Sequence, residues 1–188
     1  MDLKQLIKDR RSIAAYKEDA VSADLMKELL DVAVWVPNHK MTEPWRFVFV
    51  TDETKKKLAE INRDIAKEKA KNASEEELEQ IGEIGYQKIM SVPFIIFVIN
   101  QVNPIEKLIE EDYASASCLI QNFSLLAWEK GLSVFWKTGK LAFCEETADL
   151  IRLQDNERVI GLLQVGYPAK DQSPVMRIPA TDRITELS

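Results

Sequence analysis

Four short β-rich runs alternate with helical segments along this chain, and this alternation restricts the possible folds more than any other feature. The runs cover residues 47–50, 93–99, 132–136 and 159–165, and β-branched, aromatic and leucine side chains dominate them. Runs of this length and composition are typical of buried strands. Strands that alternate with helices usually form one sheet with helices packed around it. We therefore expect an α+β fold, close to α/β, with a single sheet.

The N-terminal part of the chain predicts two helices before the first strand. Residues 2–11 have apolar side chains at helical spacing, which predicts a short helix. Ser22 is a suitable N-cap for a second helix, and that helix must end before Pro37.

The strongly charged segment 52–90 also predicts two helices. Ser74 and Glu77 have the spacing of a capping box, which marks the start of the second one. Its expected apolar stripe consists of Leu78, Ile81 and Ile84.

A longer helix is expected to begin at Asn103-Pro104, with asparagine as the N-cap, and to end at Gly131. Its small-residue run Ala114–Ser117 allows close approach of a neighbour, which is either the sheet or a second copy of the helix. A further helix is expected near 145–153, and residues 169–188 have the character of an extended tail.

Composition limits the compartment and the partners. The 188 residues, 46% hydrophobic, suffice for one domain spanning 1–188. A net charge of −6 disfavours nucleic acid and anionic membranes as partners. The N-terminus has no signal-peptide pattern, and the longest apolar run, 92–99, is shorter than the ~20 residues of a membrane helix. With two cysteines outside any metal-binding spacing, we expect a cytoplasmic protein.

The inventory of reactive side chains is poor. A single histidine excludes multi-histidine metal sites, and the chain has no G-x-S-x-G elbow, no G-x-G-x-x-G loop and no P-loop. We expect no metal and no catalytic side chain, so a cofactor would carry the chemistry if the protein is an enzyme.

A few residues are candidates for binding, each with an ordinary alternative. Arg10-Arg11-Ser12 offers two guanidinium groups and a hydroxyl, which suit a phosphate monoester, but arginines at a helix end also complement its dipole. His39 could be a solvated loop residue. Trp45 and Trp136 fit the core better than a cofactor platform, and 137–140 could be a plain basic turn.

Taken in order, five blocks of the chain resemble the nitroreductase family of FMN-dependent oxidoreductases. Arg10-Arg11-Ser12 is similar to the family's Arg-(Arg/His)-Ser. Pro37, Pro44 and Trp45 match its Ala-Pro-Ser-x-x-Asn-x-Gln-Pro-Trp. The other three blocks are 125–132, 136–139 and 160–168, which are similar to the family's Leu-Ala-Ala-x-x-x-Gly-Leu-Gly, Trp-Arg-Ser-Gly and closing strand with Gly-Tyr-Pro.

This resemblance implies a nitroreductase-like fold with a mixed sheet, and an intertwined homodimer with FMN at each subunit interface. By position, Arg10, Arg11 and Ser12 would hold the phosphate and ribityl chain. Residues around Trp35, Asn38 and His39 would come from the other subunit. The turn Trp136-Lys137-Thr138-Gly139 would line the flavin, with backbone N–H groups near N5. Lys137 keeps the charge of the family's arginine without its bidentate fork.

The implied reaction is ping-pong: NAD(P)H reduces the flavin at N5, and an oxidised acceptor such as a nitroaromatic or quinone then takes the electrons. Met41 and Glu43 replace the family's asparagine and glutamine, so substrate preference does not carry over directly. Two alternatives stay open. One is a relative that acts on a dedicated metabolite, such as an enone or a flavin, and the other is a non-catalytic flavin-binding or interaction protein.

Overall fold

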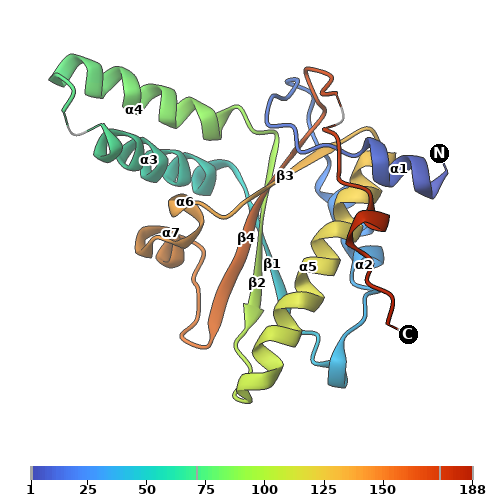
Figure 1. The fold of residues 1–188 in the computed structure, drawn as a ribbon. Helices are drawn as coiled ribbons and strands as arrows, with labels where there is room; N and C mark the ends of the chain where they lie inside the picture. Colours follow the sequence, from blue (N-terminus) through green and yellow to red (C-terminus); the bar gives the residue numbers. More distant parts are fainter. Residues whose placement is uncertain (1, 71, 174, 188) are drawn as a thin grey trace.

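A computed structural model describes residues 2–70, 72–173 and 175–187, and it is organised around a four-stranded sheet (Figure 1). The strands are β1 (Trp45–Val50), β2 (Phe94–Gln101), β3 (Ser133–Lys137) and β4 (Glu157–Gly166), in the spatial order β1-β2-β4-β3. All four predicted strands are therefore present. Met1, Pro174 and Ser188, the ends of the expected domain and one residue of the expected tail, lie outside the described residues.

The expectation of a mixed sheet was wrong for these strands, although the α+β class and the single sheet are confirmed. Each neighbouring pair, β1 with β2, β2 with β4 and β4 with β3, runs antiparallel. The connections through helices allow either direction, so the sequence alone does not decide it.

Helices cover both faces of the sheet, and two apolar clusters result. On one face, α2 (Ala23–Ala33) and α5 (Glu106–Glu129) pack through residues such as Met26, Leu119 and Phe123. On the other face, α3 (Asp52–Lys69), α6 (Lys140–Phe143) and α7 (Glu145–Leu150) pack through Leu58, Ala142 and neighbours. Residues 94–100 of β2 are buried, whereas β1 is a half-buried edge strand, contrary to the expected buried run. The sequence patterns did not predict the short helix α6.

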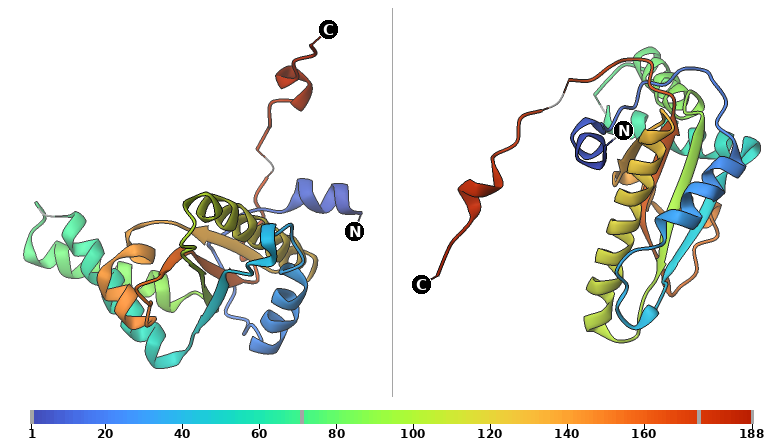
Figure 2. Two further views of the ribbon diagram at one scale, coloured as in Figure 1. Left: turned by 90° about the horizontal axis from the view of Figure 1, so that it is seen from below. Right: turned by 90° about the vertical axis from the view of Figure 1, so that its right-hand side faces the viewer.

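The helices α3 and α4 (Glu75–Met90) extend away from the sheet as an antiparallel arm (Figures 1 and 2). The Ser74–Glu77 capping box forms as predicted. The expected stripe is only partly correct, because Ile84 is exposed while Gly82 and Gly85 are buried against α3. A Cβ on Gly85 would lie 2.8 Å from the Ala66 Cβ, so the close approach of the helices requires glycine there.

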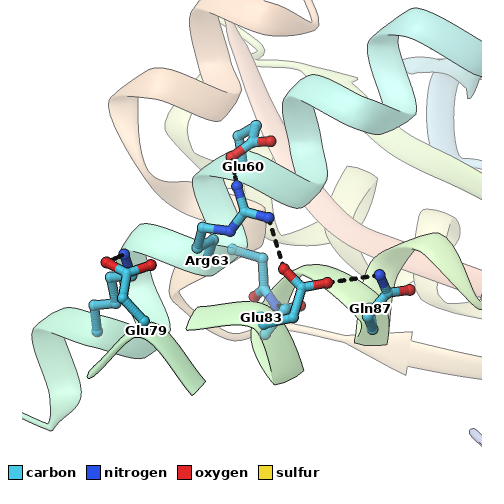
Figure 3. A network of polar contacts seen from close by, with 8 residues as sticks. Glu60, Arg63, Glu79, Glu83 and Gln87 are labelled. Atoms are coloured by element: carbon cyan, nitrogen blue, oxygen red, sulfur yellow. Dashed lines mark hydrogen bonds and ion pairs between the residues drawn. The ribbon is translucent and has the colours of Figure 1, made fainter. Parts of the chain in front are cut away.

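Charged side chains fasten the two helices of the arm to one another (Figure 3). Arg63 of α3 pairs with Glu60 on its own helix and, at 2.9 Å, with Glu83 of α4. Gln87 donates to the same Glu83 carboxylate at 2.7 Å. Exposed pairs of this kind contribute little individually, so the glycine packing carries most of the contact.

The long helix α5 begins later than expected, at Glu106. Asn103 accepts a hydrogen bond from the backbone N–H of Ile105 at 3.0 Å, so it closes a turn before the helix and is not the N-cap. The helix ends before Gly131, which has φ of 79°. Within the small-residue run, Ala116 packs in the core and Ser115 donates to the Pro37 carbonyl at 2.6 Å. These two residues therefore serve packing inside the chain.

The N-terminal helix and the start of the C-terminal tail lie near one another, whereas the end of the tail points away from the body (Figure 2). The first helix, α1 (Leu3–Asp9), packs on α5, and the tail passes close to α1 before it leaves the body (Figures 1 and 2). The tail is extended as predicted, except for one short 3₁₀ turn, η2 (Ala180–Arg183).

Replacing Glu157 with glutamine is expected to lower the free energy of unfolding at pH 7 by about 1–3 kcal/mol. The Arg46 side chain of β1 donates to both carboxylate oxygens of Glu157, at 2.7 and 2.6 Å, and the Glu157 side chain is buried. The variant leaves the guanidinium facing a neutral amide, while the exposed Glu53→Gln change should have little effect. Urea denaturation measures both.

The effect should depend on pH in a defined direction. Hydrogen bonds from Arg46 hold the pKa of Glu157 below its ordinary value. A lowered carboxyl pKa contributes stability that is full above the unfolded value, about 4.3, and is lost as the pH falls through the folded value. The difference between wild type and Glu157→Gln should therefore narrow in acid, and a difference that widened would contradict the role of this ion pair.

Candidate functional site

Two arginines and a serine form a cationic cluster where α1 ends. Arg10 donates to the Ser12 hydroxyl at 3.4 Å. Partial burial, then the nearby Arg11 and Arg177 guanidinium groups, lower the pKa of Arg10. In the described part of the chain no carboxylate forms an ion pair with Arg10 or Arg177. Like charges held together without a counter-charge suit an anionic ligand, and a phosphate fits this donor set.

Arg11 has a different environment from Arg10. Its Nη1 donates to the backbone carbonyls of Lys8 and Arg10, at 2.5 and 2.7 Å, so the side chain fastens the end of α1. Its Nε is buried without a partner among the described residues. The ordinary role of a helix-end arginine therefore applies to Arg11 but not to Arg10, whose side chain faces Ser12.

The segment after this cluster is fixed along the sheet. Ile13 accepts a hydrogen bond from Ser133 at 3.0 Å, and the Tyr16 hydroxyl donates to the Gln164 carbonyl at 3.0 Å. Tyr16 also forms an isolated bridge with Pro168. These contacts join the N-terminal segment to β3 and β4, and they fix the position of Arg10 and Ser12 relative to the sheet.

A cavity of about 420 Å³ lies next to this segment, and Ala14, two residues after Ser12, is one of its lining residues. This volume is in the range of small-molecule sites. Residues from the N-terminal segment, the arm, the sheet and α6 line it: Ala14, Asn62, Ile65, Lys69, Lys88, Ile89, Lys137, Gly139, Lys140, Leu141, Ala142, Leu162 and Gln164. The predicted residues Lys137 and Gly139 thus form part of its wall, and Thr138 lies exposed between them.

Trp136 belongs mainly to the packing below that wall. Its indole N–H donates to the Ile160 carbonyl at 3.2 Å, and the ring packs against the α2–α5 core. A Cβ on Gly161 would lie 1.9 Å from the Trp136 Nε1, so only glycine fits beneath the ring. The core role expected for Trp136 is confirmed, and this packing fixes the strand end that carries Lys137.

The loop that contains Asn38 and His39 forms a 3₁₀ turn, η1 (His39–Met41), with strained backbone. Lys40, Met41 and Glu43 have φ of 60°, 49° and 41°, a region that non-glycine residues rarely adopt. Side-chain hydrogen bonds hold the loop, since Asn38 donates to the Thr42 hydroxyl at 2.9 Å and accepts from the Glu43 N–H at 2.8 Å.

The same loop is fastened to the first turns of α5. His39 pairs through Nδ1 with Glu111, and the Thr42 hydroxyl donates to the buried Asp112 carboxylate. A strained loop that persists because several contacts hold it is a common property of binding sites.

The contacts of their segments place Arg10 and His39 near opposite ends of α5 within one chain. His39 contacts Glu111, near the start of that helix, while Ile13 contacts Ser133, just past its end at Glu129. Eighteen residues separate 111 from 129, which corresponds to about 27 Å of helical rise. A single chain therefore does not bring Arg10 and His39 into a common site.

Two features of the site escaped sequence reasoning. Arg177 is in the tail, where no periodicity points to it, although an arginine in an apolar stretch was a usable signal. Lys69 and Lys88 belong to helices whose charge resembles that of an ordinary solvated surface. The predicted site residue Trp35 is 84% exposed, so its side chain is accessible to a partner chain.

Comparison with known proteins identifies the family. The model of the nitroreductase family matches residues 7–167, so this chain belongs to the nitroreductase family. It is 37% identical over 186 residues to a putative NAD(P)H nitroreductase, YfhC, of Bacillus subtilis, covering 98% of this chain and 94% of that protein.

Solved structures give the same result. A nitroreductase-like family protein from Bacillus cereus superimposes with a TM-score of 0.84 at 35% identity, over 100% of this chain and 96% of that one. The FMN and NADPH-dependent nitroreductase NfnB from sphigopyxis sp. strain HMH superimposes with a TM-score of 0.77 at 15% identity, over 100% of both chains, which shows a common fold. The family resemblance and the nitroreductase-like fold are thus confirmed.

Membrane-spanning helices and metal-ligand clusters are absent from the described residues. No helix among them is both long and apolar enough to cross a membrane. No group of three or more histidine, cysteine or acidic residues within 2–70, 72–173 and 175–187 is arranged to hold a metal ion.

Proposed function

We propose that this protein is a homodimeric FMN oxidoreductase that passes electrons from NAD(P)H to a nitroaromatic, quinone or similar acceptor. Membership of the nitroreductase family supports oxidoreductase chemistry in general. The observation that carries the proposal is the short segment from Arg10 to Ala14, which joins an unpaired cationic cluster to a cavity. A phosphate at one end and a planar ring at the other would match that arrangement.

The proposed roles follow from position. Arg10, Ser12 and Arg177 would bind the phosphate through charge-assisted hydrogen bonds, while Arg11 holds the end of α1 and adds charge. Lys137, Thr138 and Gly139 would line the ring, and the backbone N–H groups of this turn would stabilise charge near flavin N5. Trp136 would support the turn from below.

The second half of the site would come from a partner chain. His39 lies too far from Arg10 in its own chain, and a two-fold dimer could place it, together with Trp35 and Asn38, over the neighbour's cluster. Large apolar residues exposed on α1, before η1 and in the tail would supply apolar surface for such an interface. They include Leu3, Ile7, Trp35, Val175, Met176, Ile178 and Leu187. We propose residues 1–188 as one FMN-binding domain of this dimer.

When bound, FMN would accept two electrons from NAD(P)H and release them to the acceptor in a ping-pong sequence. The side chains would bind, orient and stabilise charge, and none would act as an obligatory acid or base. The free thiols of Cys118 and Cys144 agree with a location in the reducing cytoplasm.

Flavin released by heating the purified protein is expected to be FMN and not FAD. The cationic cluster suits a terminal phosphate, and the chain has no Rossmann loop for an adenine dinucleotide. Chromatography against both standards identifies the flavin. FAD, or no flavin after reconstitution, would refute the proposal. FMN without NAD(P)H oxidation in the presence of nitroaromatics and quinones would instead indicate a relative with a dedicated substrate or a flavin-binding protein.

A further inference from the structure

The cavity is basic, although the protein as a whole is acidic. Four lysines line it, Lys69, Lys88, Lys137 and Lys140, and no aspartate or glutamate is among its lining residues in the described part of the chain. The whole sequence has 31 acidic and 25 basic residues. The lining lysines come from α3, α4, the end of β3 and the start of α6. The fold thus concentrates positive charge in one hollow of an acidic surface.

Most of this charge has no internal counter-charge. Lys140 pairs with Glu68, but Lys69, Lys88 and Lys137 form no ion pair within the described residues. The Lys137 ammonium lies over the Phe135 ring, 4.1 Å from its centroid. Burial and then the neighbouring Lys88 lower the pKa of Lys137. Clustered ammonium groups disfavour one another, and a bound anion would relieve that cost.

Helix dipoles account for only part of this arrangement. Lys69 and Lys88 lie in the last turns of α3 and α4, where cations are favoured. A lysine at a helix end interacts favourably with the dipole even when its side chain points into solvent. The dipoles therefore do not require the side chains of Lys69 and Lys88 to line one cavity with Lys137 and Lys140.

The proposed flavin phosphate does not account for the charge either. Arg10, Ser12 and Arg177 would bind it, and none of them lines the cavity. Of the lysines there, only Lys137 belongs to the proposed flavin contacts, so three remain unassigned. They belong to the arm and to α6, whereas Lys137, Leu162 and Gln164 of the same lining belong to the sheet.

We propose that Lys69, Lys88 and Lys140 bind an anionic group, a carboxylate or a phosphate, of the substrate that exchanges electrons with the flavin. This inference rests on the proposed function and names its substrate class. The anion is either the carboxylate of an acidic aromatic acceptor or the 2′-phosphate that distinguishes NADPH from NADH. Both would gain charge-assisted hydrogen bonds from the same ammonium groups.

Lys69→Met tests the proposal, because it removes a charge and keeps an unbranched side chain. Lys57→Met is the matched control, since Lys57 is an exposed residue of the same helix that does not line the cavity. Two ratios of kcat/KM are measured on the holoprotein. One compares 4-nitrobenzoate with nitrobenzene as acceptor, and the other compares NADPH with NADH as donor.

In Lys69→Met one of these ratios is expected to fall about ten-fold relative to wild type and Lys57→Met, as for the loss of one charge-assisted hydrogen bond. A lower ratio of 4-nitrobenzoate to nitrobenzene would identify the bound anion as the carboxylate of the acceptor. A lower ratio of NADPH to NADH would identify it as the 2′-phosphate of NADPH. If neither ratio changes, the proposal is overturned.

Direct binding separates this proposal from the proposed function. Calorimetry measures the affinity of 4-nitrobenzoate and of adenosine 2′,5′-bisphosphate, with nitrobenzene and AMP as their references. Binding of either anion that weakens in Lys69→Met supports the pocket even if the protein oxidises no NAD(P)H. If neither anion binds to a protein that does turn over nitrobenzene, the anion-binding proposal is refuted while the proposed oxidoreductase function stands.

Discussion

Replacing Arg10 with alanine is expected to raise the dissociation constant for FMN about ten-fold or more while the fold persists. Arg10 faces Ser12 and Arg177 with no carboxylate partner among the described residues, so its guanidinium group is available to a phosphate. A hydrogen bond to a charged group is worth about 1.5–3 kcal/mol, which corresponds to this change in affinity. Titration of the apoprotein with FMN measures it, and thermal unfolding without flavin checks the fold.

The control addresses the alternative that Arg10 only complements the dipole of α1. Lys8 is the basic residue in the last turn of that helix, so Lys8→Ala removes a similar helix-end charge and should leave FMN affinity unchanged. Arg177→Ala should weaken FMN binding in the same direction as Arg10→Ala, because Arg177 lies close enough to lower the pKa of Arg10 and would bind the same phosphate. Unchanged affinity in Arg10→Ala would return this arginine to the helix-end role.

Local patterns predicted the elements well where local physics decides the outcome. The Ser74–Glu77 capping box forms, Ser22 accepts a hydrogen bond from the Leu25 N–H as an N-cap, and α5 ends before Gly131. Each of these depends on residues a few positions apart. For the same reason the four strands could be located from their own composition.

Features that depend on distant neighbours could not be predicted in this way. Helical spacing pointed to Ile84 as buried, yet the α3 backbone approaches the side of α4 that carries Gly82 and Gly85. Strand direction follows from the path of the connections and not from the composition of each strand. The start of α5 moved because the Asn103 side chain binds the Ile105 N–H in a turn.

The site follows the same division. The block Arg10–Ser12 and the turn 136–139 were visible as motifs, and the turn lines the cavity. Arg177, Lys69 and Lys88 join them only through folding, from a tail and from two charged helices. The distance between Arg10 and His39 along α5 was also invisible in the sequence, and it is the observation that makes a second subunit necessary for a shared site.

A heterodimer of an Arg10→Ala chain with a His39→Ala chain is expected to retain one tight FMN site out of two. If each site takes Arg10 from one chain and His39 from the other, this pairing leaves one site intact and concentrates both lesions in the second. Distinct affinity tags isolate the heterodimer, and titration with FMN counts the tight sites. Both homodimers should bind FMN weakly, and a His39→Ala homodimer with wild-type affinity would remove His39 from the site.

The reciprocal pairing should give the opposite result. A chain with both substitutions, paired with a wild-type chain, places one lesion in each composite site, so no tight site is expected. If Arg10 and His39 of one chain served the same site, the two outcomes would be exchanged, with no tight site in the first heterodimer and one in the second. The about 27 Å of helix between the two contact points argues for the composite arrangement, because neither side chain can cover that distance within its own chain.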